Sequence, residues 1–328
     1  MSGCHLLGHA PMREYLLGHA PMREYAAPAD TLTSGMTTSM DVRALAAVDV
    51  HVHVEADGSG RFSLDDELLA ASARYFRSDH DRAPTVEQIA AYYRERRMAA
   101  VVFTVDATTA TGHQALSSEE IADRAADHAD VLIPFGSVDP LVPGEAAARA
   151  RKLVDRHGVR GFKFHPSLQN FAPNDPSVYP VYEAIEEMGV PVVFHTGQTG
   201  IGAGLPGGRG IKLRLSDPML IDDVAADFPH LQVILAHPSV PWQDAAISIA
   251  THKANVYIDL SGWSPKYFPP QLVRSINSLL QDKVLFGTDY PLLTPDRWLR
   301  DFGLLDVKPA VRPKVLKENA VRLLGLHG

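Results

Sequence analysis

From residue 47 onward the chain alternates short apolar runs, rich in β-branched residues, with longer segments of mixed polarity. Such alternation is typical of a parallel sheet whose strands are joined by helices. We predict strands at 47–55, 99–106, 131–139, 159–166, 191–197, 231–239, 255–262 and 283–291.

The segments between these runs have the apolar spacing of amphipathic helices, and several begin with Thr, Ser or Asp at the N-cap or with an early Pro. No GxGxxG motif follows the first strand, which argues against an open dinucleotide-binding sheet. Strands that are each followed by a helix instead predict a closed (β/α)8 TIM barrel. The predicted helices cover 85–97, 117–129, 145–157, 180–188, 217–228, 241–252, 269–280 and 311–326, with a short extra helix at 64–76.

The first forty residues differ from the rest. The decapeptide LLGHAPMREY occupies 6–15 and is repeated without change at 16–25, and an Ala/Pro/Thr/Ser-rich stretch follows. With little apolar periodicity to bury, we expect a disordered tail over 1–40 and one barrel over 41–328. A duplication or an upstream start codon explains the repeat more simply than a metal site at His9 and His19, and Met36 or Met40 would then be the natural beginning.

Composition narrows the function further. Hydrophobic residues make up 45% of the 328 residues and charged residues 21%, as in a soluble globular protein. The net charge of −8 argues against a nucleic-acid partner. No apolar run is long enough to span a membrane, and no signal peptide is evident. Cys4 is the only cysteine, which excludes an intrachain disulfide and a cysteine metal cluster, and we expect a cytoplasmic protein.

In the first predicted strand, valines alternate strictly with polar residues. Side chains two positions apart share a face of a strand. We therefore expect the valines to pack against the outer helices and the polar residues to point into the barrel, where two histidines could hold one cation. The valines are Val48, Val50, Val52 and Val54, and the polar residues are Asp49, His51, His53 and Glu55.

Polar side chains recur at the carboxyl ends of later strands, where the catalytic residues of such barrels arise. A single histidine at a strand end is more often structural, but this recurrence predicts a functional rim. The residues are Lys163, His165, His195, His237 and Asp289.

This arrangement resembles the amidohydrolase superfamily over about residues 47–325. The segments GFKFHP, FHTG, AHPS and FGTDYP look most like the amidohydrolase-related branch that includes aminocarboxymuconate semialdehyde decarboxylase and γ-resorcylate decarboxylase. The resemblance implies one divalent ion held by His51, His53, His195 and Asp289, with His237 as a catalytic acid or base. Three neutral imidazoles and a carboxylate suit Zn²⁺.

Lys163 leaves the number of ions open. In binuclear relatives a carboxylated lysine at this strand bridges two ions, with His195 and His237 as further ligands. We favour a single ion, in which case Lys163 or His165 contacts the substrate.

The glycine-rich loop at 197–218 carries cations, and aromatic residues follow the sixth and seventh strands on the same rim. The cations could bind an anion and the aromatics a planar substrate, although a solvated loop and ordinary packing explain them equally well. The cations are Arg209, Lys212 and Arg214, and the aromatics are Trp242, Trp263 and Tyr267.

The same loop, with 236–253 and 259–273, is similar to bacterial hydrolases of 4-hydroxyphenyl-β-ketoacyl-CoA. That similarity implies hydrolytic carbon–carbon cleavage of a β-keto thioester in the breakdown of aromatic compounds. The ion would polarise the ketone, Asp289 would help to deprotonate water, and His237 would stabilise the oxyanion or shuttle the proton. The loop would receive the phosphates of CoA.

Three alternatives stay open. Fold and ligands alone do not separate this hydrolase from a non-hydrolytic decarboxylase of an aromatic or muconate acid, or from a lactone or amide hydrolase. A non-catalytic metal-binding scaffold would need no His237. The branch that the chain resembles also implies a homo-oligomer, for which the sequence itself has no signal.

Overall fold

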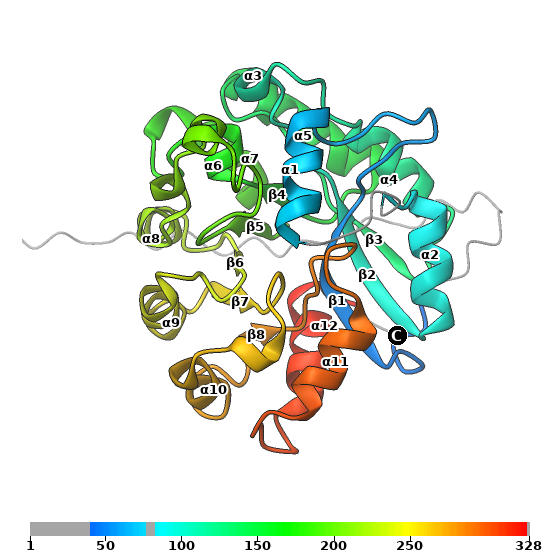
Figure 1. Cartoon of the computed structure of the whole chain (residues 1–328), viewed down its shortest axis with the longest axis vertical. Helices are drawn as coiled ribbons and strands as arrows, with labels where there is room; N and C mark the ends of the chain where they lie inside the picture. Colours follow the sequence, from blue (N-terminus) through cyan, green and yellow to red (C-terminus); the bar gives the residue numbers. More distant parts are fainter. Residues whose placement is uncertain (1–39, 77–82, 327–328) are drawn as a thin grey trace, which may run out of the picture. The chain divides into compact units, whose positions relative to one another are not determined.

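In the computed structural model, which describes residues 40–76 and 83–326, eight parallel strands form a ring surrounded by helices (Figure 1). The predicted (β/α)8 barrel is therefore confirmed. Apart from Met40, the expected tail with its repeated decapeptide lies outside the described residues. The strands are β1 (Ala47–His53), β2 (Met98–Phe103), β3 (Leu132–Pro134), β4 (Phe162–Phe164), β5 (Val192–His195), β6 (Val233–Ala236), β7 (Val256–Asp259) and β8 (Val284–Leu285).

Backbone hydrogen bonds close the ring at two places. Strands β1 to β3 pair in order, as do β4 to β8. Between β3 and β4, the amide of Lys163 donates to the carbonyl of Gly136 (2.8 Å). Between β8 and β1, the amide of Val50 donates to the carbonyl of Phe286 (3.0 Å). A closed ring brings the carboxyl ends of all the strands to one rim.

Most helices agree with the sequence prediction, which did not include the four-residue helices Thr108–Thr111 and Pro166–Gln169. Two larger differences remain. A helix at Pro295–Gly303 was not predicted, although Thr294 caps it and Pro295 begins it. The final predicted helix divides into a π-helical turn, Lys314–Glu318, and a short α-helix. The α-helices are α1 (Asp66–Phe76), α2 (Val86–Glu95), α3 (Thr108–Thr111), α4 (Ser118–Ala126), α5 (Pro143–His157), α6 (Pro166–Gln169), α7 (Tyr179–Glu187), α8 (Met219–Asp227), α9 (Gln243–His252), α10 (Pro270–Ile276), α11 (Pro295–Gly303) and α12 (Asn319–Leu323). Short 3₁₀ turns occupy Pro176–Val178, Pro206–Gly210, Leu213–Ser216 and Pro265–Tyr267.

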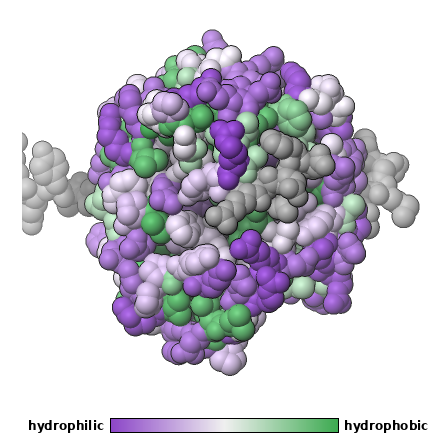
Figure 2. Space-filling model, viewed as in Figure 1, coloured by the Kyte–Doolittle hydropathy of each residue, from purple (hydrophilic) through white to green (hydrophobic). Residues whose placement is uncertain are grey.

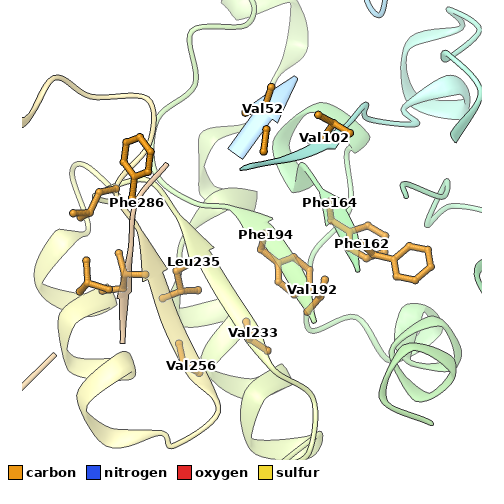
Figure 3. Close-up of a cluster of buried hydrophobic side chains, with 14 of the residues drawn as sticks. Val52, Val102, Phe162, Phe164, Val192, Phe194, Val233, Leu235, Val256 and Phe286 are labelled. Atoms are coloured by element: carbon orange, nitrogen blue, oxygen red, sulfur yellow. The ribbon is translucent and has the colours of Figure 1, made fainter. Parts of the chain in front are cut away.

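Buried apolar side chains form two large clusters, one on each face of the strands, and a small third cluster of Leu68, Ala107 and Leu168. The larger cluster packs the strands against the helices and includes Val102, Phe164 and Phe194 (Figure 3). The second includes Val193 and Ile234. On the face drawn in Figure 2 most residues are hydrophilic, and hydrophobic residues occur in separate groups. This agrees with helices that bury their apolar faces against the strands.

A β-bulge in β1 overturns part of the predicted alternation. Asp49 pairs with Ala100, whereas Val52 pairs with Val102, so that Val50 and His51 together oppose a single residue of β2. An extra residue on one strand reverses the faces on either side of it.

The prediction that Asp49 points into the barrel is therefore wrong. Its carboxylate accepts a hydrogen bond from the hydroxyl of Tyr93 in α2 (2.7 Å). The valines are divided too, because Val48 and Val50 join the second cluster, while Val52 stays with the helix-facing one. His51 and His53 do share the predicted site.

Candidate metal centre and active site

A cavity of about 720 Å³ opens at the carboxyl ends of the strands. Its polar lining includes six of the predicted site residues: His53, Lys163, His165, His195, His237 and Asp289. Its apolar walls come largely from α1, which crosses the strand ends in Figure 1, and from the loops after β5, β7 and β8. These walls include Leu69, Ala73, Phe76, Ile201, Trp263, Tyr267 and Leu293. A concave apolar space with a few convergent polar groups is the usual form of a small-molecule site.

Three donor atoms converge at the floor of this cavity, two from the lining residues His53 and Asp289 and one from His51, which is fully buried. His51 Nε2 lies 3.3 Å from His53 Nε2 and 3.3 Å from Asp289 Oδ1. His53 Nε2 lies 3.0 Å from the same carboxylate oxygen. Donors at about 2.0–2.2 Å from one tetrahedral Zn²⁺ are about 3.3–3.6 Å apart. The spacing of the three atoms therefore fits a shared first-row ion.

Two further histidines adjoin this triangle. His237 offers a donor atom within 4.8 Å of those of His51 and Asp289. Its Nε2 lies 3.0 Å from His195 Nδ1. His195 Nε2 is buried and has no hydrogen-bond partner among the described residues. An orphaned buried nitrogen can act as a metal ligand, and the place of His195 in the four-ligand set stays a prediction.

Burial keeps the imidazoles neutral, which is the form that binds a metal. Burial lowers the pKa of His51 to about 3, and the nearby charge of Lys163 acts in the same direction. Burial also lowers the pKa of His237, and it holds the pKa values of His165 and His195 well below the ordinary range.

Asp289 and Lys163 are the charged groups at the cavity floor, and the pKa values of both are lowered, for different reasons. Burial alone would raise the pKa of Asp289, but its hydrogen bond with His53 and the charges of His51, His53 and His237 together outweigh this and lower the pKa. Burial lowers the pKa of Lys163 to about 8, against the attraction of the neighbouring carboxylates. The Lys163 Nζ lies 3.1 Å from His51 Nε2, the atom that would bind the ion.

The backbone is left-handed at two of the predicted catalytic positions. The φ angle is 72° at His237 and 68° at Asp289. Such angles are unfavourable for residues other than glycine and cluster at functional sites. The amide of Asp289 is held by the carbonyl of His51 (2.9 Å), which ties β8 to β1 at the metal site.

Sequence reasoning missed the supporting residues of β7. Asp259 Oδ2 lies 2.8 Å from His51 Nδ1, and Ser261 Oγ lies 2.9 Å from His237 Nδ1. Burial would raise the pKa of Asp259, but His51 and Ser261 together hold it below its usual range. Asp259 directly follows the apolar run 256–258 of the predicted strand, so the rule that selected His195 and His237 could also have selected it.

The predicted substrate contacts divide into two groups. Lys163, His165, Trp263 and Tyr267 line the cavity. The described residues that line it do not include Arg209, Lys212, Arg214 or Trp242. The guanidinium of Arg209 is instead paired with Asp65 (2.6 Å) and Glu67 (3.0 Å) at the start of α1.

A family model described as Amidohydrolase matches residues 48–326, and the chain therefore belongs to this family of metal-dependent enzymes. An uncharacterised TIM-barrel protein from Bordetella bronchiseptica is similar in fold, with 24% identity, a TM-score of 0.70, and coverage of 85% of this chain and 98% of that one.

Two solved decarboxylases share the fold. A dihydroxybenzoic acid decarboxylase from Polaromonas sp. JS666, with bound manganese and the inhibitor 2-nitroresorcinol, is 17% identical with a TM-score of 0.63, covering 86% of this chain and 97% of that one. A 5-carboxyvanillate decarboxylase from Novosphingobium aromaticivorans, complexed with manganese and 4-hydroxy-3-methoxy-5-nitrobenzoic acid, is 14% identical with a TM-score of 0.61, covering 90% and 99%. No helix in the described ranges is long and apolar enough to cross a membrane.

Proposed function

We propose that this protein is a metal-dependent decarboxylase of a hydroxylated aromatic acid. The observation that carries the proposal is the convergence of His51, His53 and Asp289 at 3.0–3.3 Å on the floor of a cavity with apolar and aromatic walls. The solved relatives described as decarboxylases of aromatic acids support this substrate class.

The donor set suits one Zn²⁺ per chain, bound by this triangle and His195. Manganese is the competing ion, because it is present in both solved decarboxylases. Two ions would require carboxylation of Lys163. The ion would supply a Lewis acid that binds and polarises oxygen atoms of the substrate.

The chain's own residues would hold the ring and move one proton. Decarboxylation breaks the bond between the ring carbon and the carboxylate, and that carbon must gain a proton as CO₂ leaves. Asp289 and His237 have ligand atoms within 4.8 Å of each other, and we assign to them the relay of this proton from water to the ring carbon. Trp263 and Tyr267 offer aromatic faces to a planar ring, and Lys163 and His165 offer polar contacts to its substituents.

Hydrolytic carbon–carbon cleavage of an aryl β-ketoacyl-CoA is the second candidate. A cavity of about 720 Å³ has room for a longer acyl chain. The same residues would then move the proton of an attacking water, as they also would in a lactone or amide hydrolase. This candidate is weakened because the loop cations expected to bind the CoA phosphates are not placed to do so. Arg209 is paired with carboxylates, and the described lining of the cavity does not include Lys212 or Arg214.

Isotopes separate the two reactions. Metal-stripped protein is reloaded with Zn²⁺ or Mn²⁺ and offered dihydroxybenzoates, carboxyvanillates, aryl β-ketoacyl-CoA thioesters and lactones in D₂O or H₂¹⁸O. Decarboxylation places deuterium on the ring carbon that lost its carboxylate and incorporates no ¹⁸O. Hydrolytic carbon–carbon cleavage of the aryl β-ketoacyl-CoA places ¹⁸O in the aryl acid and releases acetyl-CoA, and this result would replace the proposed reaction with the second candidate.

Two variants test the site independently of the substrate screen. Asp289→Asn should abolish turnover and weaken metal binding, whereas Asp296→Asn makes the same change at an exposed carboxylate in α11 and should alter neither. Turnover that survives both chelation and Asp289→Asn would exclude the metal site from the reaction.

A further inference from the structure

Asp259 lies fully buried behind the histidines of the candidate metal centre. Its Oδ1 accepts hydrogen bonds from the backbone amides of Ser261 (2.9 Å) and His237 (3.3 Å) and from the Ser261 hydroxyl. Its Oδ2 faces His51 Nδ1 at 2.8 Å. A carboxylate surrounded by donors is an acceptor, so His51 Nδ1 carries the hydrogen. The Nε2 of His51, which faces Asp289, is then left with its lone pair free.

Ser261 extends this ordering to a second histidine. A hydroxyl has one hydrogen, and that of Ser261 is directed to Asp259. Towards His237 Nδ1, 2.9 Å away, the Ser261 oxygen must therefore accept. His237 consequently carries its hydrogen on Nδ1, and its Nε2 has only a lone pair.

The same argument reaches His195 one step further on. The bare Nε2 of His237 can only accept, so His195 Nδ1, 3.0 Å away, must donate. The Nε2 of His195 is then bare as well. This agrees with a separate observation, because that buried atom has no hydrogen-bond partner in the described part of the chain.

We propose that Asp259 is a positioning residue that sets the protons of three histidines in the site. It acts directly on His51, and through Ser261 on His237 and His195. The result is that two predicted ligands present bare Nε2 atoms before any ion arrives. A metal-binding histidine needs such a partner on its other nitrogen, and the inference rests on the metal site of the proposed function.

The tautomers can be measured on metal-free protein with ¹⁵N-labelled histidine, by long-range ¹H–¹⁵N correlation. We expect His51, His195 and His237 all to be protonated at Nδ1. Ser261→Ala removes an oxygen 3.0 Å from His51 Nδ1, but that atom keeps Asp259 at 2.8 Å and should stay protonated. The same change should remove the Nδ1 preference of the other two histidines, and Ser261→Thr, which keeps a hydroxyl, should restore it. An Nε2–H form of His51 or His237 in the wild type would overturn the proposal.

Metal affinity gives a second readout, by competition for Zn²⁺ with a chromophoric chelator. Loss of a residue that supports a metal ligand weakens binding about 10–100-fold, and we expect this for Asp259→Asn. Ser261→Ala should weaken it less, by about tenfold, because His51 keeps its partner. Ser264→Ala is the matched control, since it removes a buried hydroxyl–carboxylate bond, to Asp301 (2.6 Å), that involves no histidine.

The Ser261 variants decide the matter even if Asp259→Asn does not fold. Wild-type tautomers and wild-type zinc affinity in folded Ser261→Ala would refute the relay. Failure of the proposed decarboxylation is a separate outcome, because the tautomers are read without metal or substrate.

Discussion

Replacement of Asp49 by alanine tests the architecture behind the metal site. Its buried carboxylate accepts four hydrogen bonds: from the hydroxyls of Tyr93 (2.7 Å) and Thr288 (2.6 Å), and from the amides of Thr288 (3.0 Å) and His51 (3.1 Å). It thus joins α2 and β1 to the residue that precedes Asp289. Asp49→Ala removes all four acceptor contacts at once.

The loss in free energy of unfolding depends on which of the four donors can find another acceptor. The two hydroxyls are 3.5 Å apart and can turn towards each other. The amides of His51 and Thr288 are fixed by the backbone and shielded from water. A buried donor left without an acceptor costs about 1–3 kcal/mol, so the two amides together should lower the free energy of unfolding by about 2–6 kcal/mol.

Tyr93→Phe is the matched control, because it removes one of the four bonds and leaves the carboxylate in place. One hydrogen bond to a charged group contributes about 1.5–3 kcal/mol, and the lower end is expected here because three donors remain. The free energies of unfolding are compared by urea denaturation of the metal-free proteins. If Asp49→Ala is no less stable than Tyr93→Phe, the amides are not held as described and the reasoning fails.

Two further predictions concern the same region. Gly262 has a φ of +73°, and a Cβ there would lie 2.7 Å from His237 Nδ1; Gly262→Ala should therefore cost at least about 1–2 kcal/mol in urea unfolding and shift the ¹⁵N signals of His237. Gly303→Ala, where a Cβ meets open space, is the control, and equal effects of the two changes would contradict the assignment. Burial raises the pKa of Asp49 from 3.8 to about 7, so the folded protein holds this proton more tightly than the unfolded chain does. The stability that this proton contributes is therefore complete below about pH 4 and is lost as the pH rises through 7. Asp49→Asn should flatten the plot of the free energy of unfolding against pH over this range. An unchanged slope in the variant would contradict the assigned pKa shift.

Much of the site followed from the sequence because strand ends in a parallel barrel share one rim. The apolar runs located the strands, and the polar residue after each run located His195, His237 and Asp289. The local signals for α11 were also present, in the cap Thr294 and the adjacent Pro295. That helix could have been predicted from them.

Pairing across the fold decided what local pattern could not. The alternation in β1 assigned Asp49 to the same face as His51, but β2 opposes two residues of β1 with one and so turns Asp49 towards α2. The sequence of β1 alone does not predict this bulge, because a bulge is defined by how β1 and β2 pair.

The contacts that support the metal ligands, and those that hold the loop arginine, also depend on pairing between distant parts of the chain. His51 and Asp259 are 208 positions apart, and Arg209 and Asp65 are 144 apart. Residue type and strand position select the groups able to bind a metal. Which nitrogen of each imidazole keeps its hydrogen, and whether a loop arginine faces the cavity or a neighbouring helix, depends on atoms that only the closed barrel brings within hydrogen-bonding distance.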